Sequence, residues 1–378
     1  MSRTTPNQIY LDYNASTPID PQVAAVMRQA LDGAFGNPSS THWAGAPAHA
    51  MVETARQRVA DLLGCSSNEI IFTSGGSESN NHALMGLYYA CEISYPHIIT
   101  TRVEHPSIVE PCRFLDRLGA RITSLPVDRT GRVNPDNLRE AITASTILIS
   151  IMHANNEVGT IQPIEEQAGI AREHSIPFHT DAAQSVGKVP TKVDELGIDL
   201  LSIAGHKLYA PKGIGALYVR SGIELEPLIH GASHERGRRA GTESALLTAA
   251  LGKACELASD LSGMKDISAL RDRFWEGLQQ AFDDRVVLNG HPEERLPNTL
   301  NVSFAGQIGA EILESMPEIA ASTGSACHSG KVELSPVLEA MQVPPEVGAG
   351  AIRFSLGRAT TADEIDIVIE RLTGQLPA

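Results

Sequence analysis

Apolar segments alternate with helical segments between Glu69 and Val219, and this alternation limits the folds open to the chain. Short apolar runs predict buried strands, and strands separated by helices predict a mostly parallel, doubly wound α/β sheet. We expect strands over 69–72, 97–100, 121–126, 146–152, 176–181, 200–204 and 215–219. Such sheets bind ligands beyond the carboxyl ends of their strands, so polar residues that follow a strand are the first functional candidates.

Lys207 follows one of these strands, in the segment Gly205-His206-Lys207. Burial at such an edge lowers the pKa of a lysine and leaves more of it as the neutral amine. A neutral amine can attack a carbonyl carbon and form a Schiff base, as enzymes of pyridoxal 5′-phosphate (PLP) require. A lysine in a surface turn would give the same local sequence, so this segment alone does not distinguish a PLP lysine from a surface lysine.

A second strand end carries an acid. Asp181 ends the strand that begins near Ile176, and Gln184 follows it in the next turn. PLP needs a carboxylate against its pyridinium nitrogen, because the protonated ring accepts electrons better. Asp181 suits that role, and Gln184 could reach the ring hydroxyl. Asp181 could also be a helix N-cap, but an acid and a lysine at two strand ends indicate a site more strongly than either alone.

A glycine-rich turn over 73–81 separates the strand at 69–72 from a helix. A strand, such a turn and a helix start form a cradle of free backbone N–H groups for a phosphate, and Ser77 adds a hydroxyl. The turn matches neither the Walker nor the Rossmann fingerprint of nucleotide-binding proteins, so a nucleotide ligand is disfavoured. A simple N-cap turn is the alternative, and a PLP lysine nearby favours the phosphate cradle.

Further candidates follow other strands. His105 could stack on a pyridine ring and move protons near neutral pH, and Asn156 could bind a carboxylate or the ring oxygen. Cys327 lies among small residues in a predicted flexible, accessible loop, beside a histidine that favours the nucleophilic thiolate. Arg353 ends a late strand and could bind a substrate carboxylate, a task for which Arg358 is the rival.

The composition excludes several classes of function. With 42% hydrophobic and 20% charged residues, the chain is an ordinary globular protein. A net charge of −15 without a basic run argues against a nucleic-acid partner. The sequence has no secretion signal and no apolar window of transmembrane length, so we expect a cytoplasmic protein with no membrane partner. The five cysteines lack Cys-x-x-Cys spacing, so we expect no disulfide framework and no metal site.

The character of the sequence changes near Thr242. Helical segments over 242–261 and 267–282 precede strands over 285–288, 300–304, 318–321 and 351–355 and a last amphipathic helix over 362–372. This pattern predicts a smaller α+β domain after the large one. We place the large PLP-binding domain at 15–258, and the small domain, with the cysteine loop, at 1–14 and 259–378.

Taken together, these motifs resemble those of the NifS/IscS-type cysteine desulfurases, in the class V aminotransferase group of fold-type I PLP enzymes. The resemblance runs nearly end to end. It rests on Tyr10-Leu-Asp-Tyr-Asn-Ala15, Asn37-Pro-Ser-Ser40, Phe72-Thr-Ser-Gly75, Glu104-His-Pro-Ser107, Asn155-Asn-Glu157, His179-Thr-Asp-Ala-Ala-Gln184, Gly205-His-Lys207, Gly237-Arg-Arg-Ala-Gly-Thr242, Gly324-Ser-Ala-Cys327 and Arg353-Phe-Ser-Leu-Gly-Arg358.

The resemblance implies a homodimer with a role for each motif. Lys207 carries PLP, Asp181 pairs with the ring nitrogen and His105 stacks on the ring as an acid/base. Gln184 and Asn156 contact the ring hydroxyl and the substrate, to which Arg353 and Asn14 also bind. The phosphate is held by Gly76, Ser77, His206 and, from the other subunit, Thr242. Cys327 takes sulfur from L-cysteine as a persulfide, releases alanine and passes the sulfur to an acceptor protein.

Some positions depart from the family pattern. Ala204 stands where a phosphate-binding serine is common, and Ser77 replaces the usual threonine. His328-Ser329-Gly330 and Ser335 also resemble selenocysteine lyases, which share the fold and cofactor. Selenocysteine lyase and another class V reaction, such as transamination, are therefore the alternative functions. The sequence ends soon after Leu372, without the longer tail with which housekeeping desulfurases engage an iron–sulfur scaffold, so the sulfur acceptor stays open.

Overall fold

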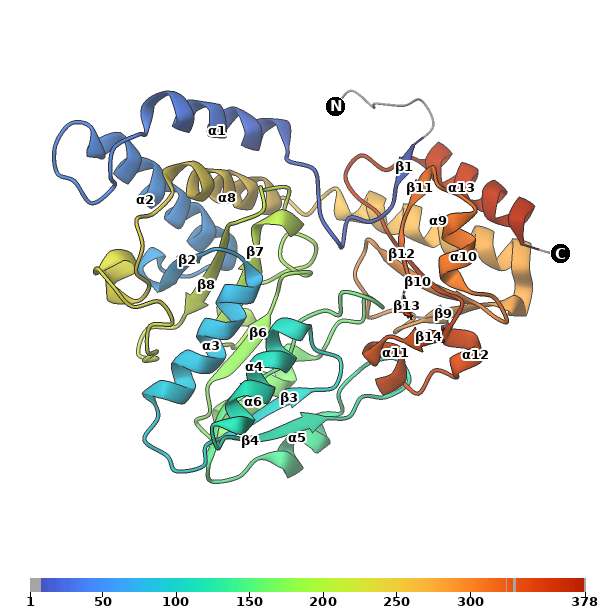
Figure 1. Ribbon diagram of the computed structural model, residues 1–378, viewed down its shortest axis with the longest axis horizontal. Coiled ribbons are helices and arrows are strands. Elements are labelled where there is room, and N and C mark those ends of the chain that lie inside the picture. The colour runs from blue at the N-terminus through green and yellow to red at the C-terminus, as the bar shows by residue number, and fades with distance from the viewer. Residues whose placement is uncertain (1–7, 324, 329–330, 377–378) are drawn as a thin grey trace.

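The computed structural model describes residues 8–323, 325–328 and 331–376, with only the backbone for 325–328 and 331–333 (Figure 1). Its large sheet has the strand order β2-β8-β7-β6-β5-β3-β4. These strands are β2 (Ile70–Thr73), β3 (His97–Thr101), β4 (Arg121–Leu125), β5 (Thr146–Ser150), β6 (Phe178–Asp181), β7 (Leu200–Ala204) and β8 (Gly215–Val219). The predicted α/β class and each predicted strand of this sheet are confirmed.

Strand β8 is antiparallel to both of its neighbours, whereas β3, β4, β5, β6 and β7 pair in parallel. Residues 205–214 alone connect β7 to β8. A connection between parallel strands needs a dozen residues or more, usually with a helix. This link is too short for that, so β8 runs in the direction opposite to β7.

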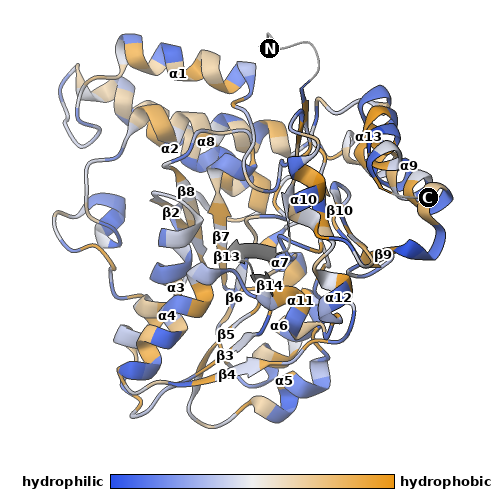
Figure 2. Ribbon diagram, turned by 45° about the vertical axis from the view of Figure 1, so that its right-hand side comes forward, coloured by the Kyte–Doolittle hydropathy of each residue, from blue (hydrophilic) through white to orange (hydrophobic). Residues whose placement is uncertain are grey.

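Helices cover both faces of the large sheet, because successive strand residues point to opposite faces. Ile70, Leu201 and Ile203 pack into one apolar cluster with α2 (Gly45–Leu63), α6 (Ile164–Glu173) and α8 (Ala245–Ala258). Ile71, Leu200 and Leu217 pack into another with α3 (Gly76–Ala90) and α4 (Pro106–Arg117). Figure 2 shows the mixed apolar and polar colouring of these helices, as expected of helices with one buried side. The sheet is doubly wound, as predicted.

A small sheet of order β12-β15-β10-β9 lies beside the large one (Figure 1). Its antiparallel strands are β9 (Val286–Asn289), β10 (Thr299–Phe304), β12 (Ser322–Thr323) and β15 (Ala351–Ser355). Helices α9 (Met264–Phe282) and α13 (Ala362–Gln375) cover it through an apolar cluster that includes Phe274 and Phe354. The remaining helices are α1 (Pro21–Gly33), α5 (Pro135–Ala141), α7 (Val193–Leu196), α10 (Gly309–Glu314), α11 (Pro336–Ala340) and α12 (Pro345–Gly348).

The N-terminal strand β1 (Ile9–Tyr10) pairs in parallel with β11 (Ile319–Ala320), so the first described residues join the C-terminal part of the chain. Conversely, Val337 and Leu338 of α11 belong to an apolar cluster of the large sheet. The division into 15–258 and 1–14 with 259–378 stays a prediction. No helix of the described residues is long and apolar enough to cross a membrane.

The segment that carries Cys327 is a hairpin, although the sequence predicted a flexible loop. Strand β13 (Ser325–His328) pairs antiparallel with β14 (Lys331–Leu334), and Cys327 lies opposite Val332. Polar and apolar residues alternate along 331–334, and this period of two, which indicates a strand, was the missed signal. The Cys327 side chain lies outside the part of the structure that is described.

A buried ion pair ties α2 to the segment that precedes α8. Arg56 Nη1 lies 2.6 Å from Glu235 Oε2, and both side chains are buried. The same carboxylate accepts a hydrogen bond from the backbone N–H of Phe72 at 3.0 Å. Glu235 and Arg236 have positive φ values of 48° and 58°, a conformation that costs ~1–3 kcal/mol in a non-glycine residue. The ion pair therefore holds a strained segment against the sheet.

We expect Glu235→Ala to lower the free energy of unfolding by up to about 3–5 kcal/mol, because it leaves the buried Arg56 guanidinium with only the partly exposed Glu53 carboxylate as an ionic partner. Urea unfolding followed by circular dichroism measures the loss. The matched control is Glu173→Ala, which removes one partner of the exposed Arg139–Glu173 pair and should cost far less. Equal losses in the two variants would contradict a stabilising role for the buried pair.

Candidate active site

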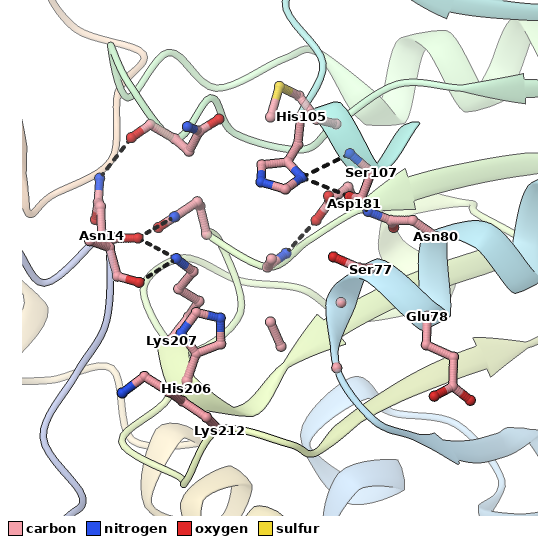
Figure 3. A pocket seen from close by; sticks show the side chains of 18 of the residues that line it. Asn14, Ser77, Glu78, Asn80, His105, Ser107, Asp181, His206, Lys207 and Lys212 are labelled. Atoms are coloured by element: carbon pink, nitrogen blue, oxygen red, sulfur yellow. Dashed lines mark hydrogen bonds between the residues drawn. The ribbon is translucent and has the colours of Figure 1, made fainter. Parts of the chain in front are cut away.

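A cavity of about 550 Å³ lies beyond the carboxyl ends of β5, β6 and β7, the position expected of a ligand site in this sheet (Figure 3). Strand β15 of the small sheet contributes one wall through Arg353. The cavity is lined by most of the predicted site residues, namely Asn14, Gly76, Ser77, His105, Asn156, Asp181, Gln184, His206, Lys207 and Arg353. Residues far apart in the sequence thus meet at one place.

Lys207 lies in a short 3-10 turn (Gly205–Lys207) that follows β7. Its Nζ donates to the backbone oxygens of Asn14 at 2.6 Å and Ala15 at 2.8 Å. Burial, with the Arg353 guanidinium second, lowers the pKa of Lys207 to about 8, against the opposing effect of Asp12 and Asp181. About a tenth of Lys207 is therefore neutral amine at pH 7, far more than for an ordinary lysine, and a nucleophile for a carbonyl carbon must be neutral.

Asp181, at the end of β6, is buried and fixed through both carboxylate oxygens. Oδ2 accepts from Asn80 Nδ2 at 2.7 Å, and Oδ1 accepts from the backbone N–H of Ala183 at 2.9 Å. Each carboxylate oxygen has two lone pairs, so the group can accept a further hydrogen bond from a ligand in the cavity. In Figure 3, Asp181 lies across the cavity from Lys207.

His105 is the N-cap of α4, and its Nδ1 accepts from the backbone N–H of Ser107 at 3.1 Å. Because Nδ1 accepts, the proton of the neutral ring is on Nε2. Burial lowers the pKa of His105, and the charge of Lys207 adds to this effect while that of Asp181 opposes it. A neutral imidazole therefore faces the cavity, where it can stack on a ring and exchange a proton (Figure 3).

The turn after β2 has the features of a phosphate cradle. Helix α3 begins at Gly76 without a side-chain cap, which leaves N–H groups of its first turn for a ligand. A Cβ atom at Gly76 would lie 3.2 Å from the Ala204 Cβ atom, so this close approach favours glycine. Nδ1 of His206, on the same cavity, is buried and has no partner among the described residues. Lys212 adds a positive charge to this wall.

The two rival arginines lie in different places. Arg353 lines the cavity, where Nη1 donates to the backbone oxygen of Asn156 at 2.9 Å and Nη2 lies 2.8 Å from Asp12 Oδ1. Arg358 lines a neighbouring cavity instead, with its guanidinium 4.5 Å from the Tyr209 ring centroid. The geometry therefore favours Arg353 for a ligand carboxylate.

Two predicted site residues are not among the described residues that line this cavity. Thr242 is exposed in the segment that precedes α8, and the resemblance assigned it to the partner subunit's site. Cys327 lies on β13, and its side chain lies outside the described part. Their roles stay predictions. Among the described residues, no group of three or more His, Cys, Asp or Glu side chains could hold a metal ion.

Sequence reasoning missed Asn80, Ser107, Lys188 and Lys212. Asn80 and Ser107 belong to segments already singled out, and Lys212 follows the Lys207 segment, so nearness to those motifs could have revealed them. Lys188 had no local signal. Its Nζ donates to the side-chain oxygens of Gln184 at 3.0 Å and Asn14 at 3.2 Å.

The described residues fit PLP. An amine with a lowered pKa, a fixed carboxylate, a neutral histidine and an uncapped helix start surround one cavity. These are the partners that a carbonyl, a pyridinium nitrogen, an aromatic ring and a phosphate need. The unpartnered His206 Nδ1 is a further polar atom that a bound group could satisfy.

Comparison with known proteins decides the family. A family model for class V aminotransferases matches residues 9–368. The chain belongs to this family. It is 50% identical to cysteine desulfurase IscS of Dictyoglomus turgidum, over 98% of this chain and 95% of that protein. PLP, the predicted cofactor, is the cofactor of the class V family, so this prediction is confirmed.

Solved structures of family members share the fold. A NifS-like protein superposes with a TM-score of 0.91 at 36% identity, covering 97% of this chain and 98% of that one. A structure of SspA in complex with cysteine gives a TM-score of 0.82 at 38% identity, covering 92% and 98%. The predicted resemblance to NifS/IscS-type proteins and the fold-type I architecture are confirmed.

The lowered pKa of Lys207 predicts a pH dependence for cofactor attachment. We expect the rate at which PLP-free protein takes up PLP to rise with pH to a midpoint near 8, since the neutral amine reacts. In Arg353→Gln the midpoint should move upward, because the guanidinium is one cause of the lowered pKa. Stopped-flow absorbance measures both. A wild-type midpoint at the ordinary lysine pKa would contradict the described environment.

Proposed function

We propose that this protein is a PLP-dependent cysteine desulfurase that converts L-cysteine to L-alanine and transfers the sulfur through Cys327 to an acceptor. The observation that carries the proposal is that Lys207 and Asp181 face one cavity with Arg353, in a chain 50% identical to a protein named cysteine desulfurase. The first two residues suit PLP, and the arginine suits an amino-acid carboxylate.

The predicted site residues that line the cavity have distinct roles in this reaction. PLP, when bound, withdraws electrons from the substrate amino acid. Lys207 Nζ holds the cofactor, and Asp181 keeps the ring nitrogen protonated. His105 packs against the ring and moves protons, while Gln184 and Asn156 contact the ring hydroxyl and the substrate.

Other residues hold the charged ends of the two ligands. Gly76, Ser77 and His206 hold the phosphate, with Thr242 of a second subunit. Arg353 binds the substrate carboxylate, which an arginine can hold through two parallel hydrogen bonds. Asn14 has no free hydrogen-bonding capacity in its side chain, and this favours a supporting role for it over contact with substrate.

Cys327 is the sulfur acceptor within the protein. Its thiolate attacks the substrate sulfur, the Cβ–S bond breaks, and the electron pair left on Cβ takes up a proton. The products are L-alanine and a Cys327 persulfide, so atoms and electrons balance without an external oxidant. The persulfide then passes its outer sulfur to an acceptor protein, for which iron–sulfur cluster assembly is one destination.

A homodimer and a cytoplasmic location complete the proposal. The homodimer is supported by Thr242, which is exposed in one chain and has a phosphate-binding role only if a second chain supplies it. Size-exclusion chromatography with light scattering tests the dimer, and cell fractionation tests the location.

Cys327→Ala is expected to abolish alanine formation from L-cysteine under a reductant, while the absorbance of bound PLP persists. The matched control is Cys112→Ala, since Cys112 is buried in α4 with a pKa raised to about 12 by burial. That variant should keep its activity.

Other outcomes of the same assay favour the alternatives. Alanine from L-selenocysteine alone, unchanged in Cys327→Ala, would favour selenocysteine lyase. Alanine from neither substrate, together with amino transfer to a keto acid, would favour an aminotransferase.

Arg353→Lys is expected to lower kcat/KM for L-cysteine by about 10–100-fold, because lysine keeps the charge but loses the bidentate hydrogen bonds to a carboxylate. Steady-state kinetics measures the loss. Arg358→Lys serves as the control, since Arg358 lies in the neighbouring cavity. A larger loss in the control would assign the substrate carboxylate to Arg358.

A further inference from the structure

A second lysine, Lys188, contacts two residues of the cavity from outside it. Its Nζ donates to Gln184 Oε1 at 3.0 Å and to Asn14 Oδ1 at 3.2 Å. Gln184 and Asn14 both line the described cavity, whereas Lys188 is not among its lining residues. Lys188 therefore acts on that cavity through these two amides.

An ammonium group only donates hydrogen bonds, so Lys188 fixes the orientation of both amides. The oxygen of Gln184 must face Lys188, and the amide nitrogen must face the other way. That nitrogen donates to the backbone oxygen of Asn14 at 2.9 Å. A flipped Gln184 would set its NH₂ against the ammonium and its oxygen against the Asn14 carbonyl, and both contacts are repulsive.

The described hydrogen bonds are possible in both charge states of Lys188. Burial chiefly, with the charges of Lys207 and Arg353, lowers the pKa of Lys188 to about 7. A neutral amine still has two N–H groups, one for each of the two oxygens. Above that pKa the Asn14 carbonyl still favours the described orientation of Gln184, since it can only accept.

Asn14 is held in place at each of its polar atoms. Its side-chain oxygen accepts from Lys188 and from Asn298 Nδ2 at 3.0 Å. Its side-chain nitrogen donates to Thr299 Oγ1 at 2.8 Å, and its backbone N–H donates to Ser355 Oγ at 2.9 Å. Because Asn14 is fixed, its backbone carbonyl accepts one N–H of the Gln184 amide at a fixed position.

We propose that Lys188 is a positioning residue that holds Gln184 so that its second amide N–H is free to donate to the ring oxygen of PLP. The inference rests on the proposed function, because it assumes that PLP occupies the cavity that Gln184 lines. A donor at that oxygen stabilises negative charge on it, and so lowers the pH at which the bound cofactor loses a proton.

The test is a pH titration of the absorbance of the PLP-loaded protein, without substrate. In Lys188→Met, the ammonium no longer opposes a flip of Gln184 and only the Asn14 carbonyl still does. Gln184 then presents its oxygen to the cavity in a share of the molecules, so the midpoint should rise by up to about one pH unit. Lys188→Arg keeps the donors and should titrate close to wild type. Lys192→Met removes an exposed lysine of the same segment and should leave the midpoint unchanged.

A double-mutant cycle separates positioning from a direct effect of charge. If Lys188 acts through Gln184, Lys188→Met shifts nothing once Gln184 is replaced by leucine. The proposal is overturned by an unchanged midpoint in Lys188→Met, or by an equal shift in the Gln184→Leu background. Thermal unfolding accompanies each variant, and Lys188→Gln replaces Lys188→Met if the latter does not fold. The glutamine side chain of Lys188→Gln can donate or accept a hydrogen bond, so Gln184 can still flip in this variant. An unchanged midpoint, or an equal shift in the Gln184→Leu background, would again overturn the proposal.

Because no substrate is present, the titration is independent of the desulfurase reaction. A wild-type protein that forms no alanine contradicts the proposed function, and its titration still decides the role of Lys188. A wild-type protein that binds no PLP contradicts both.

Discussion

The backbone carbonyl of Asn14 joins the parts of this protein that make the site. It accepts from Lys207 at 2.6 Å and from Gln184 at 2.9 Å, two residues that follow neighbouring strands of the large sheet. The residue itself belongs to the N-terminal segment, which is held by Thr299 and Ser355 of the small sheet. The position of the lysine relative to the small sheet therefore depends on these few short hydrogen bonds.

Burial and like charges set the chemistry of the cavity. Burial, and then the charges of Lys207 and Arg353, lowers the pKa of Lys188, and burial, and then the charge of Arg353, lowers the pKa of Lys207. Asp12 counters this charge through its contact with Arg353. A buried cluster with more cations than anions favours anionic ligands, and both a phosphate and an amino-acid carboxylate are of that kind.

The fold was more predictable from the sequence than the connections within the site. Apolar runs predicted the strands of the large sheet that are buried along their whole length, because burial on both faces leaves a continuous apolar signal, whereas the edge strand β4 is exposed at Arg121 and Ser124. The direction of β8 depended on the length of the link over 205–214, which is a topological constraint with no local pattern. The hairpin at Cys327 is short and rich in small residues, so the alternation of polar and apolar residues that indicates a strand was weak there.

The site residues were predictable where a residue type and a strand end coincide, as for Asp181 and Lys207. Lys188 was not, since its partner Asn14 is distant in sequence and the contact exists only after the chain folds. The sequence offered two arginines of one motif, Arg353 and Arg358, as the group that binds the substrate carboxylate. Only the geometry favours Arg353, because it lines the cavity and Arg358 lines a neighbouring one.

The parallel pairing of β1 with β11 limits how far the backbone of Cys327 can move. It fixes Ile319 and Ala320 beside the segment that leads to Asn14, and Ser322 donates to Asp12 at 2.9 Å. Thr323 pairs with β15, so the chain is anchored up to this residue. Cys327 lies four residues further along (327 − 323 = 4). Four extended residues span at most ~14 Å, so the anchor restricts the backbone of Cys327 to a sphere of that radius. In the proposed reaction, an acceptor protein therefore has to approach within this distance of Thr323, because the segment cannot lengthen to reach it.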